Sequence, residues 1–172
     1  MQFLEKPPVQ LIRKNHALEH ATLKLLSRSH PRFSLAGYSD QHGFWIMGDI
    51  KVEDLQTSAE EALQRLKSGE SELAFHPNCG TNFVVMGLAA ALASWFATLG
   101  AKPTWKSRMD RLPTMILFSV LGLIVSQPYA HQIQRKYTTK SEPGNLRILR
   151  IEDATRGGIV AHRVYTTDVP EA

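Results

Sequence analysis

Three residues near the start of the sequence have a spacing that suits metal binding. His16, Glu19 and His20 form an H-x-x-E-H pattern. If this segment is helical, the two histidines lie one turn apart on the same face, so both imidazoles can reach one ion. A glutamate between two metal-binding histidines can act as a general base toward water. Glu19 is therefore the candidate catalytic residue.

A second group of possible ligands follows sixty residues later, in the turn-forming segment His76-Pro77-Asn78-Cys79-Gly80. His76 and Cys79 are three residues apart, so an imidazole and a thiolate can meet on one ion. Cys79 is the one cysteine in the chain, which excludes an intrachain disulfide and leaves a thiol redox role without a resolving cysteine. The predicted metal ligands are thus His16, His20, His76 and Cys79, a tetrahedral set that suits Zn²⁺.

The number of ligands decides between two readings of this site. With three protein ligands, a coordination position stays open, and Glu19 could serve a metal-dependent hydrolase or protease. With four ligands the site is closed and structural, and Glu19 would orient a histidine ring. The alternative to an enzyme is a non-enzymatic scaffold, such as an assembly or accessory subunit of a membrane complex with other protein subunits as partners.

Two long stretches of the second half carry no Asp, Glu, Lys or Arg: Glu72 to Lys102 and Arg111 to Arg135 enclose them. A helix needs about 20 apolar residues to cross a bilayer. We expect transmembrane helices at about 83–99 and 113–130, and Pro128 to bend or end the second. The lipid bilayer is then a partner. Small residues that would let the helices meet are Gly87, Ala90, Ala91, Ser94, Ser119, Gly122 and Ser126.

The segments that flank this hairpin have mixed helical and strand patterns. We expect a helix from Val9 to about Ser29, a β-hairpin over 33–50 with a four-residue turn, a helix over 58–68 after a Thr57-x-x-Glu60 capping box, and a short strand at 72–75. Two further strands are predicted at 146–151 and 159–165. The fold class is α+β membrane protein: an N-terminal α+β domain (1–80), a transmembrane hairpin (81–131) and a C-terminal tail with short strands (132–172).

The charge distribution bears on partners and location. The formal net charge is +4, and the basic residues are spread along the chain, which argues against nucleic-acid binding. The start of the chain has no basic segment followed by an apolar one, so no signal peptide is predicted. Seven Lys and Arg residues flank the two helices against four in their connector, which favours cytoplasmic N- and C-termini, although the density of charge in the short connector argues the other way.

Three motifs resemble an uncharacterised family of bacterial membrane proteins, a domain of unknown function. They are Asn15 to Thr22 (NHALEHAT), His76 to Phe83 (HPNCGTNF) and Gln134 to Thr139 (QRKYTT). A larger uncharacterised bacterial membrane family is similar, with H-x-A-E-H, H-P-x-C-G-T-x-F and Gln-Arg-x-x-Thr-Thr in the same order. Leu18 replaces the alanine of that larger family. The resemblance implies a membrane protein with a His/Cys site, and it implies no particular activity.

Overall fold

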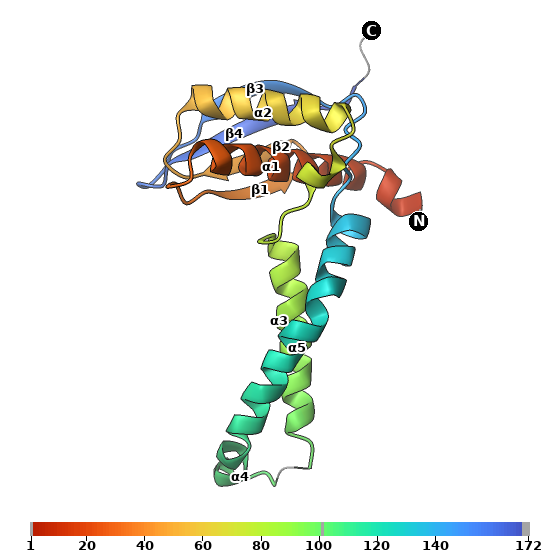
Figure 1. Ribbon diagram of the computed structural model, residues 1–172, viewed down its shortest axis with the longest axis vertical. Helices are drawn as coiled ribbons and strands as arrows, with labels where there is room; N and C mark the ends of the chain where they lie inside the picture. The colour runs from red at the N-terminus through yellow and green to blue at the C-terminus, as the bar shows by residue number, and fades with distance from the viewer. Residues whose placement is uncertain (1, 101, 170–172) are drawn as a thin grey trace. The chain divides into compact units, whose positions relative to one another are not determined.

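A computed structural model describes residues 2–100 and 102–169 of the chain. These residues form two compact units, residues 2–76 with 135–169 and residues 77–100 with 102–134, and each is described by itself (Figure 1). The first unit holds the 3-10 helices Gln2–Glu5 and Ser71–Ala74, the helices α1 (Val9–Ser29) and α2 (Val52–Lys67), and the strands β1 (Ala36–Asp40), β2 (Gly43–Met47), β3 (Arg147–Asp153) and β4 (Ala161–Thr167). The second unit holds α3 (Gly80–Ala97), α4 (Trp105–Asp110) and α5 (Leu112–Ile133).

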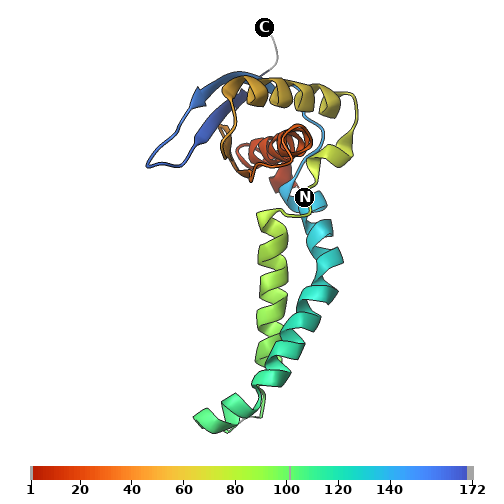
Figure 2. The same cartoon turned by 60° about the vertical axis from the view of Figure 1, so that its left-hand side comes forward.

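The first unit is an α+β fold around one four-stranded antiparallel sheet with the order β1-β2-β4-β3. Helix α1 packs on β1 and β2, and α2 packs on α1 and β3. Figure 2 shows α1 almost along its axis, with α2 and the strands around it. The fully buried side chains include Leu18 and Leu26 of α1, Phe44 and Ile46 of β2, and Val164 of β4. Burial of these side chains places α1 in the middle of the core.

Helix α1 has the limits that its sequence pattern predicts, but the hairpin after it is tighter than expected. Asp40 pairs with Gly43, so the loop is the two residues Gln41 and His42 and the expected four-residue turn is wrong. The Asp40 side chain accepts a hydrogen bond from the His42 amide at 2.7 Å, which closes the turn locally. Gly43 has a φ of 141°, and a Cβ there would lie 1.9 Å from the Val164 carbonyl oxygen. Only glycine fits this position.

Helix α2 begins at Val52, six residues before the predicted start. Thr57 therefore lies inside the helix, where its hydroxyl donates to the Glu53 carbonyl at 2.9 Å, and the capping box is wrong. The predicted stop is confirmed, because the helix ends at Lys67 and Gly69 has a φ of 97°. The expected strand at 72–75 is also wrong, since Ser71–Ala74 form a 3-10 helix.

The two predicted C-terminal strands are confirmed as β3 and β4, and their place in the fold is a finding of the structure. They join the sheet of the N-terminal hairpin, with β4 between β2 and β3. Phe44 of β2 pairs with Val164 of β4 across 120 positions of sequence. The first unit is therefore built from chain segments on both sides of the second unit.

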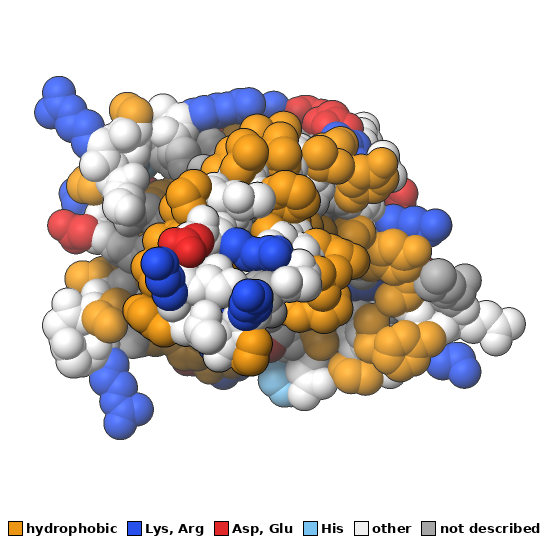
Figure 3. Space-filling view, turned by 90° about the horizontal axis from the view of Figure 1, so that it is seen from below, with side chains coloured by type: hydrophobic (Ala, Val, Ile, Leu, Met, Phe, Trp, Pro, Cys, Tyr) orange, Lys and Arg blue, Asp and Glu red, His pale blue; other side chains and the backbone are white. Residues whose placement is uncertain are grey.

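In the second unit, α3 and α5 pack along each other, and the connector between them contains α4. A π-helix, Gln134–Thr138, directly follows α5. Two helical stretches, Gly80–Ala97 (α3) and Leu112–Thr138 (α5 with this π-helix), are long and apolar enough to cross a membrane by length and composition. Only 11% and 6% of their most apolar windows are buried, which is unlike the core helix of a soluble protein. Near α4, hydrophobic side chains lie beside Lys and Arg side chains (Figure 3).

The limits of the two apolar helices differ slightly from those expected. Helix α3 begins at Gly80 with Cys79 as its N-cap residue, three residues before the expected start at about 83. Pro128 lies within α5, and the helix continues past it. The absence of a backbone N–H at Pro128 therefore does not end the helix.

The helices α3 and α5 meet at small residues, as the sequence predicts for part of the expected face. A Cβ on Gly122 would lie 2.9 Å from the Ala89 carbonyl oxygen and 3.1 Å from the Ala90 Cα atom. Gly122 therefore lets the two backbones approach closely. A Cβ on Gly87 would have no neighbouring atom within 4 Å, so Gly87 is not part of this contact.

Candidate metal centre

His16 and His20 lie on one face of α1. Their ring centroids are 4.3 Å apart, and potential ligand atoms of the two side chains lie within 4.8 Å of each other. The i and i+4 positions of a helix produce this neighbourhood directly. His20 is buried and His16 is half-buried. The predicted pairing of the two imidazoles is present in the structure.

Both imidazoles are held by backbone carbonyl groups through the same ring nitrogen. His16 Nδ1 donates to the Thr138 carbonyl at 2.9 Å, and His20 Nδ1 donates to the Ala74 carbonyl at 2.8 Å. Because a carbonyl oxygen only accepts hydrogen bonds, each Nδ1 carries the proton of the neutral ring. The lone pair is then on Nε2 in both rings. Metal-binding histidines are held and oriented in this way.

His76 brings a third imidazole to the same part of the first unit. Its ring centroid is 5.9 Å from that of His20, and the two rings are tilted by 45°. His76 follows the 3-10 helix Ser71–Ala74, whose last residue supplies the carbonyl that holds His20. One short segment therefore fixes the His20 ring and delivers His76 beside it.

Cys79 lies in the second unit, where it is the N-cap residue of α3. Its thiol is buried and forms no disulfide. It lies three positions after His76 in the sequence. The sequence-predicted ligands thus come from α1, from the segment after Ser71–Ala74, and from the start of α3.

The Glu19 carboxylate is directed toward strand β1. Its side chain is 4% exposed, and a Cβ on Gly37 would lie 2.3 Å from Glu19 Oε1. Only the absence of a side chain at Gly37 makes room for the carboxylate. Gly37 was not recognised as a site residue from the sequence, because nothing local shows which strand faces Glu19.

Asn15, the residue before His16, fixes the helix against the sheet. Its side chain is fully buried, donates to the Asp40 carbonyl at 2.8 Å and accepts from the Thr166 hydroxyl at 2.7 Å. A buried amide with both ends satisfied sets the rotation and height of α1 over β1 and β4. The sequence signal was an asparagine inside an otherwise buried helical face.

The Asp40 carboxylate extends this network on β1. Arg163 Nη2 donates to Asp40 Oδ1 at 2.6 Å. Burial opposes ionisation of Asp40, but the Arg163 guanidinium and the His42 amide outweigh it, so the pKa of Asp40 lies below its usual value. The carboxylate is therefore charged at neutral pH.

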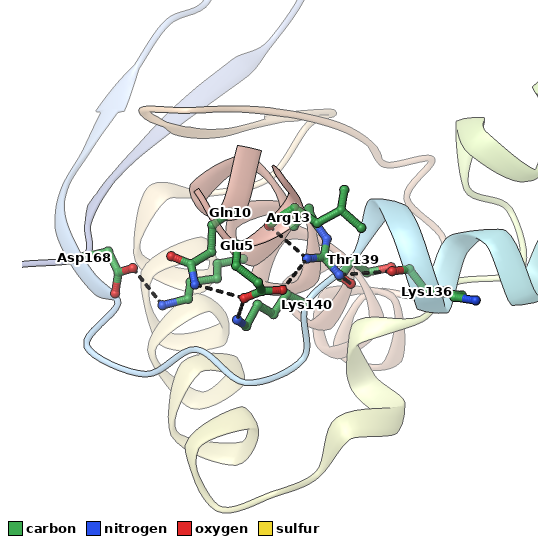
Figure 4. Close-up of polar contacts among 9 residues, drawn as sticks. Glu5, Gln10, Arg13, Lys136, Thr139, Lys140 and Asp168 are labelled. Carbon is green, nitrogen blue, oxygen red and sulfur yellow. Dashed lines mark hydrogen bonds and ion pairs between the residues drawn. The ribbon is translucent and has the colours of Figure 1, made fainter. Parts of the chain in front are cut away.

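Arg13, one turn before His16, holds the segment that contains Thr138. Its Nη2 donates to the carbonyls of Lys136 and Thr139 at 3.1 and 3.2 Å, and its Nη1 donates to Glu5 Oε1 at 3.1 Å (Figure 4). Thr138, whose carbonyl accepts the hydrogen bond from His16, therefore lies in sequence between two residues whose carbonyls accept hydrogen bonds from Arg13. Arg13 is a positioning residue that sequence reasoning missed. Its signal was a buried arginine on the same helix face as His16.

Glu5 is the acidic partner of this cluster. It pairs with Lys140 and with Arg13. The hydrogen bond from Lys140 lowers the pKa of Glu5 most; desolvation opposes this, and Arg13 adds to the lowering, which brings the pKa to about 2. The N-terminal 3-10 helix is thus tied to the segment after α5 by charges.

Comparison with known proteins gives relatives without an assigned activity. An uncharacterized protein of Picosynechococcus sp. is 40% identical over 98 residues, which cover 51% of this chain and 48% of the relative. The chain thus spans about half the length of this curated relative. No solved structure matches the chain. The family model described as "Domain of unknown function (DUF6391)" matches residues 11–151. This match covers most of the sequence, so the expectation of an uncharacterised family is confirmed and the chain belongs to the DUF6391 family.

Proposed function

We propose that this protein is a membrane-anchored zinc-binding protein whose ligands are His16, His20, His76 and Cys79. The observation that carries the proposal is the pair of imidazoles on α1, each with Nδ1 bonded to a backbone carbonyl. With Nδ1 protonated, Nε2 is in both rings the nitrogen that would bind an ion.

Chain connectivity supports Cys79 as a further ligand. Three residues of extended chain span at most about 11 Å, so Cys79 cannot lie far from His76 wherever the rest of α3 is placed. His76 is beside His20. A thiolate and imidazoles together form the donor set that zinc prefers over harder cations.

A structural zinc site is favoured over a catalytic one by the position of Glu19. The carboxylate is buried against the backbone of β1 at Gly37, where the strand restricts its movement. A general base must reach the proton that it removes. A closed site with four protein ligands suits the alternative role, a scaffold or accessory subunit of a membrane complex.

If instead only three residues bind the ion, one coordination position stays open. Glu19 would then be the general base of a hydrolase or protease.

Membrane anchoring by α3 and α5 belongs to the same proposal. Their exposed apolar surface is supported as lipid-facing by the length and composition of both helices. We place the N- and C-termini in the cytoplasm, as the distribution of Lys and Arg around the hairpin favours.

Metal analysis of the full chain, purified in detergent, tests the zinc site. We expect about one zinc per chain by mass spectrometry of the eluted metal. His16→Ala and Cys79→Ser should each lower zinc occupancy at least ten-fold, because loss of a ligand opens the tetrahedron. His42→Ala, in the exposed β1–β2 turn, is the matched control and should keep zinc. Equal zinc content in all four proteins would refute the site.

Glu19→Gln separates the catalytic from the structural reading. The amide keeps the shape of the side chain and removes its basicity. For a structural site we expect unchanged zinc content and a change in thermal stability alone. A hydrolase would keep its zinc and lose peptide or ester hydrolysis, measured with a panel of fluorogenic substrates that the wild type cleaves.

A further inference from the structure

The connector between α3 and α5 carries a short amphipathic helix, α4, whose exposed side chains are apolar or basic except for Asp110 at its end. Trp105 and Met109 lie four residues apart in α4, on one helix face, and are 76% and 42% exposed. Lys106 and Arg108, also exposed, lie to either side of that face, and exposed Lys102 precedes the helix. Apolar groups flanked by cations are thus presented together.

The fourth cation of the connector has a different role. Arg111 Nη1 donates to the carbonyls of Ala97 and Leu99 at 3.1 and 2.7 Å, which satisfies the C-terminal end of α3. Among the described residues, no carboxylate forms an ion pair with Lys102, Lys106 or Arg108. Three cations are therefore presented to the surroundings by a loop that Arg111 holds in place.

We propose that this surface binds the headgroups of anionic phospholipids. The three cations match lipid phosphates in charge, and the indole of Trp105 favours the depth between headgroups and acyl chains. Met109 points to the same side and enters the apolar layer. The proposal rests on the membrane anchoring of α3 and α5, since insertion of the hairpin brings the connector to a bilayer surface.

Lipid binding to the full chain in detergent tests the proposal. Native mass spectrometry would compare phosphatidylglycerol with phosphatidylcholine of the same acyl chains. Near an anionic surface each basic residue contributes about five-fold in affinity. We expect tighter binding of phosphatidylglycerol, and a loss of that preference of about ten-fold or more in the K102Q/K106Q/R108Q variant. The K51Q/K67Q/R32Q variant removes the same charge from exposed positions of the first unit and should keep the preference.

Preference retained in K102Q/K106Q/R108Q, or lost equally in the control variant, would overturn the proposal. A second measurement does not depend on that variant. In vesicles that contain phosphatidylglycerol, brominated acyl chains should quench a fluorescence component that Trp105→Phe removes. Quenching of that component by iodide in the water phase, and not by bromolipid, would overturn it too.

Failure of the membrane anchor can be told apart from failure of the lipid site. Washing membranes at alkaline pH should leave the wild-type chain in the membrane fraction. Release of the chain would refute both the anchor and the lipid site. Retention of the chain without preference for phosphatidylglycerol would refute the lipid site alone.

Discussion

At the scale of single residues, the packing of α1 on β1 includes a close approach between a glutamate and a glycine. Glu19 occupies the space that a side chain at Gly37 would fill. Asn15 and Arg13 hold α1 from different sides, Asn15 through the sheet and Arg13 through the segment that contains Thr138. The residues that set the geometry of the imidazoles thus outnumber the imidazoles themselves.

Gly37→Ala should destabilise the protein by about 1–3 kcal/mol, because the added methyl overlaps the Glu19 carboxylate in a filled site. Thermal unfolding in detergent measures the change. In a chain that already carries Glu19→Ala, the further change Gly37→Ala should cost much less stability than it does in the wild type, because the carboxylate that the methyl would overlap is gone. Independent, additive effects of the two substitutions would contradict the contact.

Asn15→Ala should lower both stability and zinc occupancy. It removes a buried hydrogen bond and leaves the Thr166 hydroxyl and the Asp40 carbonyl without this partner, a loss of about 1–3 kcal/mol. Because Asn15 touches no predicted ligand directly, weaker zinc retention against a chelator would report helix placement. A variant that loses stability and keeps normal zinc retention would limit Asn15 to folding.

At the scale of elements, the contact between α3 and α5 depends on one glycine. Gly122→Ala should weaken the hairpin by about 1–3 kcal/mol, because the methyl would meet the Ala89 carbonyl and Ala90. Gly87→Ala is the matched control, since it adds the same group to a membrane-length helix in open space. Thermal unfolding in detergent should separate the two, and equal stabilities would argue against the contact.

The N-terminal 3-10 helix should be the most acid-sensitive element of the first unit. The pKa of Glu5 is about 2 in the folded chain against an ordinary value of 4.5. A lowered pKa means that ionised Glu5 stabilises the fold fully above pH 4.5, and that this contribution is lost as the pH falls toward 2. Glu5→Gln should flatten the dependence of the unfolding temperature on pH in this window. An unchanged slope would show that Glu5 does not carry it.

Single elements with strong local signals were predictable from the sequence, and their partners were not. The apolar period of α1 and the glycine after α2 were enough to place those ends. The start of α2 was mistaken because Thr57 and Glu60 form the same pattern inside a helix as at its start. In the site, helix periodicity predicted the His16–His20 pair. The carbonyls of Ala74 and Thr138 were not predictable, because backbone groups carry no sequence signal.

At the scale of the whole molecule, the sheet joins the two ends of the chain. Strand β2 comes before the apolar hairpin and β4 comes after it, and the two strands are hydrogen-bonded. A single sequence gives no information about such distant pairing, so the C-terminal strands had been expected in a tail. If α3 and α5 span a membrane, the β2–β4 pairing requires the segments before and after them to share one aqueous compartment.

Reporter fusions at the two ends of the chain should therefore agree. Alkaline phosphatase is active outside the cytoplasm and green fluorescent protein folds inside it, so each end can be tested with both. We expect fluorescence and no phosphatase activity at both ends. Opposite results at the two ends would be incompatible with the β2–β4 pairing in a membrane-inserted chain.

Because the apolar helices lie between β2 and β4 in the sequence, the two strands are made at different times during synthesis. When the ribosome has made β2, the strand that will cover its edge is more than a hundred residues away. Until β4 emerges, β2 has an open edge and its apolar face is incompletely covered, which is a condition that favours aggregation. The apolar helices α3 and α5 are synthesised in this interval. Newly made chains should therefore depend on chaperones until β4 has left the ribosome.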